Sequence, residues 1–255
     1  MVVATHLTDV IAAEEFAGYG ALIFPNSELI TTAMTVTHTA RLLPYHSNVH
    51  PGEVADTLNA MRTGARDGAL SFQRIYGDSE IVRDRAKADV GLFRFRGAPG
   101  APFAIVSPGG GFSYLARAID YVFEHAAGLE VCTDGYSLWG SSAGARMAAN
   151  LAGYGTAAFG GAARPSAGTV VMAYTGHSDT DGDVPPTFAV VGSNDGIASP
   201  AIMAARIRRL ERAGVQTEFR RYPGLGHGFG LGTGTVAQGW VDAAMDFWEA
   251  QRGQR

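Results

Sequence analysis

The stretch G-S-S-A-G at residues 140–144 has the pattern G-x-S-x-G, and the rest of the chain is interpreted from it. A short apolar run at 136–139 precedes it, and a helix-compatible run at 146–151 follows. The pattern therefore predicts a strand, a tight turn and a helix, with Ser142 at the centre of the turn. Such a turn strains the serine and exposes its hydroxyl group. Glycines on both sides fit because strand and helix backbones pass too close there for a Cβ atom.

Length and composition favour one α/β domain in a chain of 255 residues. Hydrophobic residues make up 46%, which is enough for a sizeable core. The net charge of -4 argues against a nucleic-acid partner or an anionic membrane, because both favour a basic face. Cys132 is the single cysteine, so the fold depends on no internal disulfide. We expect a cytoplasmic protein, because neither a signal-peptide pattern nor a bilayer-spanning apolar run is found.

From about residue 103 onward, short apolar runs alternate with helical patterns. The runs at 103–106, 169–174 and 187–191 are continuous, which is typical of strands buried on both faces. A last strand is predicted at 217–222. Strands that alternate with helices predict the α/β class, with a mostly parallel sheet covered by helices on both faces. Ligands bind at the carboxyl ends of such strands, so side chains just past those ends should gather at one edge.

The first part of the chain lacks this alternation. We predict that residues 1–69 form an N-terminal extension that packs on or caps a catalytic domain at 70–255. Two strand-like segments, 71–76 and 90–96, open the catalytic domain. The second of them alternates polar and apolar residues, as a strand near a sheet edge does.

Two histidines in the extension raise the alternative of a metal site. His46 and His50 lie four residues apart, but prolines bracket them and no acidic third ligand is near. Polar loop residues are therefore the favoured interpretation, and we predict no metal and no cofactor. Tyr45 and His46 are also alternatives for lining the pocket, because pockets recruit loop residues.

Three residues that follow predicted strands would together supply nucleophilic catalysis. A serine hydroxyl needs an adjacent base, and His227, in a glycine-rich loop after the last strand, is the candidate. The histidine needs a carboxylate to fix its tautomer, and Asp195 is the candidate. Each residue alone is better explained as a loop or turn residue, but Ser142, Asp195 and His227 follow the α/β-hydrolase order. Three rival acids follow an earlier strand: Asp179, Asp181 and Asp183.

The triple glycine at 109–111 follows the strand at 103–106 and is predicted to form an oxyanion loop. Backbone N–H groups that point at a developing negative oxygen lower the barrier of acyl transfer, and glycine lets the backbone approach closely. The predicted donors are the amides of Gly110, Gly111 and Ala143, the last being the residue after the nucleophile. A phosphate-binding loop is the alternative, but neither a G-x-x-x-x-G-K-[ST] motif nor G-x-G-x-x-G spacing is present.

With these motifs, the chain resembles the α/β-hydrolase esterases of the acetyl-esterase/lipase group, related to hormone-sensitive lipase. The resemblance covers roughly residues 70–250, and P-G-G-G-F at 108–112 stands where the group has H-G-G-G and an aromatic residue. It is similar to the bacterial branch with P-G-G-G-[FY], some members of which deacetylate xylan or other acylated sugars. The resemblance implies a cofactor-free serine carboxylester hydrolase, with Ser142 as nucleophile, Asp195 as acid and His227 as base.

One departure from that group concerns the segment before the nucleophile. Members of the group place a helix, a strand and a further helix between the oxyanion loop and the elbow. Here 28 residues, 112–139, separate Gly111 from Gly140, which leaves room for one helix. We therefore expect an α/β-hydrolase fold that lacks one central strand and helix and leaves a strand flank unpaired.

Three function hypotheses stay open at this point. The first is a serine esterase acting on short-chain acyl esters, with acylated carbohydrates as a refinement that depends on the resemblance. The second is a peptidase or amidase with the same triad, and the third is a non-catalytic hydrolase-like binding protein. The expected partner is a small-molecule or carbohydrate ester. The oligomeric state is open, with a homo-oligomer among the options.

Overall fold

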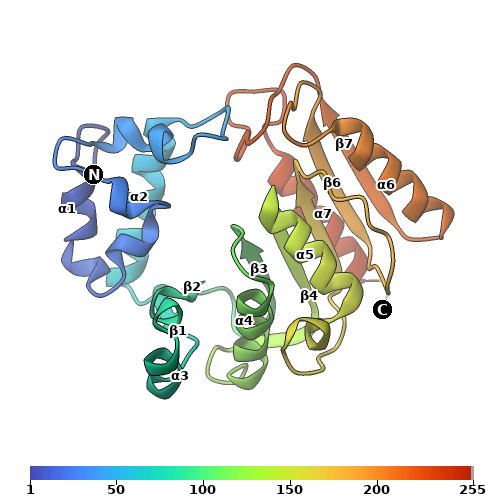
Figure 1. The fold of residues 1–255 in the computed structure, drawn as a ribbon, viewed down its shortest axis with the longest axis horizontal. Coiled ribbons are helices and arrows are strands. Elements are labelled where there is room, and N and C mark those ends of the chain that lie inside the picture. The colour runs from blue at the N-terminus through green and yellow to red at the C-terminus, as the bar shows by residue number, and fades with distance from the viewer. Residues whose placement is uncertain (254–255) are drawn as a thin grey trace. The chain divides into compact units, whose positions relative to one another are not determined.

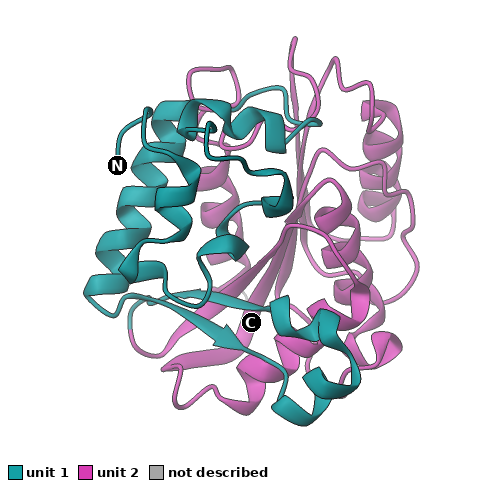
Figure 2. Cartoon of the chain, turned by 60° about the vertical axis from the view of Figure 1, so that its left-hand side comes forward, with its two compact units in different colours: residues 1–98 teal, residues 99–255 magenta. Residues whose placement is uncertain are grey.

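The computed structural model describes residues 1–253, and its chain divides into two compact units, coloured separately in Figure 2. Unit 1 is Met1–Ala98 and unit 2 is Pro99–Arg255. The sequence prediction placed a boundary after residue 69, with both hairpin strands in the second part. In the structure those strands belong to unit 1, because they pair with each other in a separate two-stranded sheet.

Unit 1 consists of short helices followed by an antiparallel hairpin. Its strands are β1 (Leu70–Arg74) and β2 (Gly91–Phe95), which pair Phe72 opposite Phe93. Its helical elements are α1 (Leu7–Ile11), η1 (Glu14–Phe16), η2 (Gly20–Ile23), η3 (Ser27–Leu29), η4 (Val36–Leu42), α2 (Pro51–Arg66), α3 (Asp78–Arg83) and η5 (Arg85–Asp89).

The hairpin and the helices of unit 1 share one apolar core. Tyr19 stacks on Phe72 at a centroid distance of 5.6 Å and meets Phe93 edge-on at 5.7 Å. Beyond these rings lie the fully buried side chains of Leu7, Val10 and Phe16. Gly91 is required at the start of β2, because a Cβ atom there would lie 2.3 Å from the Phe72 ring. Unit 1 therefore has a core of its own.

Unit 2 is built on a five-stranded parallel sheet with the order β3-β4-β5-β6-β7 (Figure 1). All residues of β5 and β6 are buried, as expected for strands in the middle of a parallel sheet. This architecture confirms the predicted α/β class with a parallel sheet between helices. The strands are β3 (Ala101–Ser107), β4 (Val131–Ser141), β5 (Thr169–Ala173), β6 (Thr187–Gly192) and β7 (Thr217–Tyr222).

Helices cover both faces of this sheet (Figure 1). On one face α5 lies against β4 and β5. On the other, Trp240 and Trp248 of α7 pack with Trp139 and Phe188 of the sheet, and the Trp248 indole donates to the Gly135 carbonyl at 2.8 Å. The helical elements of unit 2 are α4 (Phe112–Glu124), α5 (Ala143–Tyr154), η6 (Thr156–Phe159), α6 (Pro200–Arg212) and α7 (Trp240–Arg252).

The strand β3 corrects one prediction. Its continuous apolar run predicted burial on both faces, but Val106 is 69% exposed and Ala104 is exposed as well. These two residues alternate with the buried Ile105 and Ser107, so one face of β3, which forms the edge of the sheet, is left uncovered. Between Gly111 and β4 the structure has α4 as its single helix, so the expected lack of a strand and a helix is confirmed.

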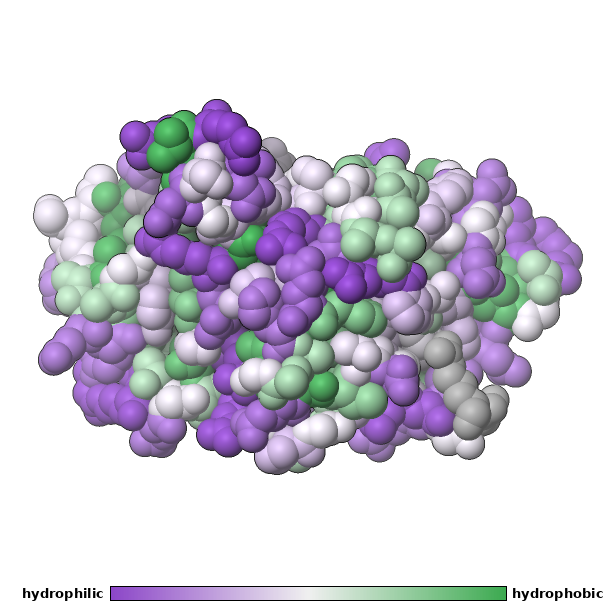
Figure 3. Space-filling model, turned by 90° about the horizontal axis from the view of Figure 1, so that it is seen from below, coloured by the Kyte–Doolittle hydropathy of each residue, from purple (hydrophilic) through white to green (hydrophobic). Residues whose placement is uncertain are grey.

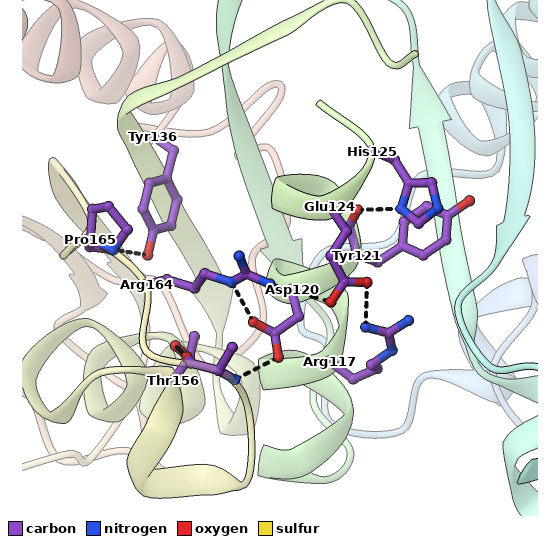
Figure 4. A network of polar contacts seen from close by, with 10 residues as sticks. Arg117, Asp120, Tyr121, Glu124, His125, Tyr136, Thr156, Arg164 and Pro165 are labelled. Carbon is purple, nitrogen blue, oxygen red and sulfur yellow. Dashed lines mark hydrogen bonds and ion pairs between the residues drawn. The ribbon is translucent and has the colours of Figure 1, made fainter. Parts of the chain in front are cut away.

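A polar network ties α4 to the segment between α5 and β5 (Figure 4). The buried carboxylate of Asp120 accepts hydrogen bonds from Arg164 Nε at 2.7 Å and from the Ala162 amide at 2.8 Å. A Cβ atom on Gly161 would approach that carboxylate to 2.9 Å, so glycine suits the turn. Because its charge is paired and hydrogen-bonded, Asp120 can stay buried while it fixes this loop.

Within residues 1–253, no helix is both long and apolar enough to cross a bilayer. On the face shown in Figure 3, hydrophilic side chains are interspersed with hydrophobic ones.

Candidate active site

The turn between β4 and α5 places Ser142 in a strained backbone conformation. Its φ of 50° and ψ of -116° lie outside the regions that a non-glycine residue ordinarily occupies. Conformations of this kind cost on the order of 1–3 kcal/mol and persist where the surrounding structure enforces them. Here the Ser142 amide donates to the carbonyl of Ala173 at the end of β5, at 2.9 Å.

Both glycines of the G-x-S-x-G pattern lie where a side chain would collide with backbone. A Cβ atom on Gly140 would lie 2.3 Å from the carbonyl carbon of Gly144. One on Gly144 would lie 1.9 Å from the carbonyl oxygen of Ser107, at the end of β3. The helix therefore starts directly against two strand ends, which forces the sharp turn at Ser142.

The structure brings His227 to this serine from the loop after β7. His227 Nε2 lies 3.0 Å from the Ser142 hydroxyl oxygen, within hydrogen-bond distance, although the two residues are 85 positions apart. On the other side of the ring, Nδ1 lies 2.9 Å from Asp195 Oδ2 and 3.1 Å from Oδ1. With Nδ1 donating to the carboxylate, Nε2 is left to accept the serine proton.

Asp195 is fixed by its own loop, which follows β6. Its Oδ1 accepts hydrogen bonds from the backbone amides of Ile197 at 2.9 Å and Ala198 at 2.7 Å. The carboxylate is fully buried, and these donors together with His227 compensate its lost hydration. A buried acid that already has its hydrogen bonds is well suited to hold an imidazole in one tautomer and orientation.

Backbone contacts join the acid loop to the base loop. The Asn194 amide donates to the Leu225 carbonyl at 2.9 Å, and the Gly224 amide donates to the Ser193 hydroxyl at 2.8 Å. A Cβ atom on Gly192 would lie 2.2 Å from the same Leu225 carbonyl. The ends of β6 and β7 are therefore held together, which sets the distance between the carboxylate and the imidazole.

The glycine loop after β3 passes beside the start of α5. Gly109 and Gly110 have φ values of 127° and 107°, which favour glycine. A Cβ atom on Gly109 would lie 3.6 Å from the Ala143 Cβ atom and 3.9 Å from the Gly144 amide. Gly111 follows and precedes α4. The structure thus places the loop next to Ala143, whose amide follows the nucleophile.

Among the rival acids, the carboxylate of Asp179 has other partners. Asp179 accepts a hydrogen bond from the Tyr154 hydroxyl at 2.7 Å and from the Asp181 amide at 2.9 Å. These bonds, that of the Asp181 amide first, lower the pKa of the Asp179 carboxyl group. The Asp183 amide donates to the Gly153 carbonyl. The carboxylate within hydrogen-bond distance of His227 Nδ1 belongs to Asp195 and not to one of the rival acids.

Sequence reasoning missed a buried cation, Arg206, and a buried histidine, His177, near these acids. Arg206 is almost fully buried on α6, and its Nε donates to the Asp179 carbonyl at 2.8 Å. Burial lowers its pKa to about 10, and neither Nη atom has a hydrogen-bond partner. Burial and the nearby charge of Arg206 lower the pKa of His177 to about 4. Arg206 was hidden because it lies in a helix face that is otherwise apolar.

Sequence reasoning also missed Tyr174, which directly follows β5. It was interpreted as the last residue of a buried strand, but it has a positive φ of 38° and contacts the ring of His227. A single sequence carries no signal for such a conformation. Among residues 1–253, no group of three or more His, Cys, Asp or Glu side chains could hold a metal ion.

Comparisons with known proteins give the fold. No protein-family model matches the sequence, and no curated protein matches it. The structure resembles an acetyl ester-xyloside bifunctional hydrolase from Caldicellulosiruptor lactoaceticus, with a TM-score of 0.58 and 15% identity over 71% of this chain and 96% of that one.

Two further solved structures are similar to this chain in fold. An esterase of the Planctomycetes species Thermogutta terrifontis has a TM-score of 0.55 and 15% identity, over 70% of this chain and 91% of that one. MGS-M1, an α/β-hydrolase enzyme from a Medee basin deep-sea metagenome library, has a TM-score of 0.54 and 18% identity, over 71% of this chain and 97% of that one. At these identities the likeness concerns the fold, and the chain has the α/β-hydrolase fold.

Proposed function

We propose that this protein is a serine ester hydrolase that acts on short-chain acyl esters. The observation that carries the proposal is the continuous hydrogen-bonded series from the Ser142 hydroxyl through His227 to the buried carboxylate of Asp195. A serine hydroxyl is a poor nucleophile on its own, and this series supplies the base and the orienting acid that it needs.

In the acylation step, Ser142 Oγ attacks the ester carbonyl carbon while His227 Nε2 takes the hydroxyl proton. The Asp195 carboxylate stabilises the imidazolium that forms. The amides of Gly110, Gly111 and Ala143 are the proposed donors to the tetrahedral oxyanion, which they would stabilise in a preorganised site. The imidazolium then protonates the departing alcohol, which leaves an acyl group on Ser142.

In the deacylation step, water takes the place of the alcohol. His227 removes a proton from the water as it attacks the acyl carbonyl, and the same proton returns to Ser142 Oγ as the carboxylic acid leaves. The cycle consumes one water and needs no cofactor. In the proposed scheme, Ser142, His227, Asp195 and the loop amides supply every group that ester hydrolysis requires.

Acylated carbohydrates are the proposed refinement of the substrate, and the acetyl-esterase/lipase group with a P-G-G-G-F loop is the proposed family. The motif at 108–112 supports both. So does the similarity to a hydrolase described as acting on acetyl esters and xylosides, although that description belongs to the other protein.

A fluorophosphonate probe tests whether the site is catalytic. We expect labelling of the wild type and of Ser79→Ala, an exposed serine on α3, and no labelling of Ser142→Ala. A folded wild type that is not labelled would favour the non-catalytic binding protein. A panel of p-nitrophenyl esters against peptide anilides then separates esterase from peptidase, and a preference for the anilides would reject the esterase proposal.

A further inference from the structure

The residue after β5 combines backbone strain with complete burial. Tyr174 has a φ of 38°, in the left-handed region that disfavours a bulky side chain, and it is 3% exposed. Its amide donates to the Val190 carbonyl of β6 at 2.7 Å, so the strained backbone is held by the neighbouring strand. Strain of this kind persists where surrounding contacts enforce it, and it concentrates at functional sites.

The side chain of Tyr174 contacts the base and its loop. Its ring meets the imidazole of His227 edge-on, with centroids 5.2 Å apart and planes at 71°. The same ring meets Phe229 at 4.9 Å and 68°. Edge-to-face contacts of this geometry are favourable and directional, so they restrict where the imidazole can lie.

The hydroxyl group of Tyr174 lies between the base loop and the nucleophile turn. Burial raises the pKa of Tyr174, and two neighbours partly oppose that rise: the side chain of Ser141, which precedes the nucleophile, and the backbone of Gly230, three residues after the base. The hydroxyl therefore stays neutral. The residue before it, Ala173, accepts the Ser142 amide. Two consecutive residues therefore contact both halves of the serine–histidine pair.

We propose that Tyr174 is a positioning residue that holds the imidazole of His227 in line with the hydroxyl of Ser142. The inference deepens the proposed function and rests on it. Asp195 fixes the Nδ1 end of the imidazole through hydrogen bonds, and the Tyr174 ring restricts sideways movement of the same ring. A displacement of about 1 Å between reacting groups can cost about 100-fold in rate, so this restriction affects turnover more than substrate binding.

Two substitutions separate the roles of the ring and the hydroxyl group. Tyr174→Phe keeps the ring and removes the hydroxyl group beside Ser141 and Gly230, and we expect kcat for p-nitrophenyl acetate to fall about tenfold. Tyr174→Leu removes the ring as well, and we expect a fall of about 100-fold. In both variants KM should stay within about twofold, because the substrate contacts are not changed.

Tyr136→Phe is the matched control. Tyr136 is also 3% exposed, its hydroxyl donates to the Pro165 carbonyl at 3.1 Å, and its ring stacks on Phe103. Removal of this hydroxyl should lower the melting temperature about as much as Tyr174→Phe, while kcat and KM stay within about twofold. Equal losses of kcat in the Tyr136 and Tyr174 variants would mean that Tyr174 acts through stability alone, which would overturn the inference.

A second readout does not need turnover. The Nδ1 proton of His227, shared with Asp195, should give a downfield proton NMR resonance that His227→Gln removes. We expect Tyr174→Leu to broaden or shift it and Tyr136→Phe to leave it unchanged. A folded Tyr174→Leu variant that keeps this resonance and kcat within threefold of wild type would overturn the inference. If that variant does not fold, Tyr174→Phe decides by the same criteria.

The same measurements separate this inference from the proposed function. A wild type that hydrolyses no ester but shows the His227 resonance, with the resonance sensitive to Tyr174 and not to Tyr136, would reject the esterase and retain the positioning role.

Discussion

Two histidines in unit 2, His227 and His177, are equally buried, each 7% exposed, but their surroundings differ. His227 has a carboxylate on one nitrogen and a hydroxyl on the other, and the carboxylate has two amide donors of its own. Burial, and after it the nearby charge of Arg206, lowers the pKa of His177 to about 4. The exposed fraction is therefore the same in both cases, and the hydrogen-bond partners and charges around the two imidazoles differ.

The difference shows which surroundings allow a buried imidazole to act as a base. Around His227 each polar group has a partner, so the site can accept a proton without exposing a bare charge. Around His177 burial and a nearby positive charge oppose protonation, and Arg206 itself has unpaired Nη atoms. We expect substitutions around His227 to lower turnover and substitutions around His177 to change stability.

The largest expected effect comes from the same substitution at both histidines. His227→Gln should lower kcat for p-nitrophenyl acetate by about 10⁴- to 10⁶-fold, because the serine loses its base. His177→Gln should leave kcat within about threefold of wild type. Steady-state kinetics of the two variants side by side test the comparison. Turnover of His227→Gln within tenfold of wild type would refute the assigned role.

Asp195→Asn should have the next largest effect, a fall in kcat of about 10³- to 10⁴-fold. The amide keeps the size of the side chain but favours the wrong imidazole tautomer, in which Nε2 carries the proton. Asp179→Asn is the control, because the carboxylate of this rival acid contacts Tyr154 and the Asp181 amide. Its kcat should stay within threefold of wild type. If the Asp179 variant lost more turnover than the Asp195 variant, the choice of acid would be wrong.

A smaller effect is expected on the pH dependence of stability. The pKa of His177 is lowered from its ordinary 6.5 to about 4 in the folded protein, so between these values the unfolded chain binds the proton more readily. Stability should therefore fall as the pH falls from 6.5 to 4, by about 2 kcal/mol after allowance for solvent screening. Above pH 6.5 the group contributes no pH dependence.

Urea unfolding at several pH values measures this loss. His177→Gln should flatten the curve between pH 6.5 and 4, and His125→Gln, at an exposed position on the end of α4, should not. A curve that stays equally steep in His177→Gln would assign the acid loss to other groups.

The smallest effect is expected at Arg206. Arg206→Met replaces a buried guanidinium with unpaired Nη atoms by an apolar side chain of similar length, and we expect the free energy of unfolding to rise by about 1–2 kcal/mol. The exposed Arg208→Met should change it by less than about 0.5 kcal/mol. Arg206→Met should also weaken the pH dependence from His177. A loss of stability at Arg206 would show that its bond to the Asp179 carbonyl outweighs the unpaired charge.

Much of the fold could be predicted from short stretches of sequence. The strand at 217–222 has the predicted bounds, and β5 ends one residue earlier than predicted. The turn at Ser142 follows from glycines two residues away on each side. Such features are recognisable because the periodicity of apolar residues and the conformational freedom of glycine act between near neighbours in the chain.

Other features depended on contacts between distant parts of the chain. Val106 is exposed because it lies on an uncovered face of the edge strand β3, and the strands of the hairpin 70–95 pair with each other in unit 1. The isolated sequence of β3 is as apolar as that of a central strand. Strand order is a property of the whole sheet, so this local run could not reveal it.

The chain order of Ser142, Asp195 and His227 was legible in the residues, and with it the fold class and the chemistry that those side chains could perform. The distance of 3.0 Å between imidazole and hydroxyl, the strain at Tyr174 and the unpaired charge of Arg206 were not. The physical reason is the distance along the sequence over which each effect acts. Backbone preferences act over a few residues, whereas the alignment of a proton-transfer pair and the pairing of a buried charge depend on groups that folding brings together from tens of positions apart.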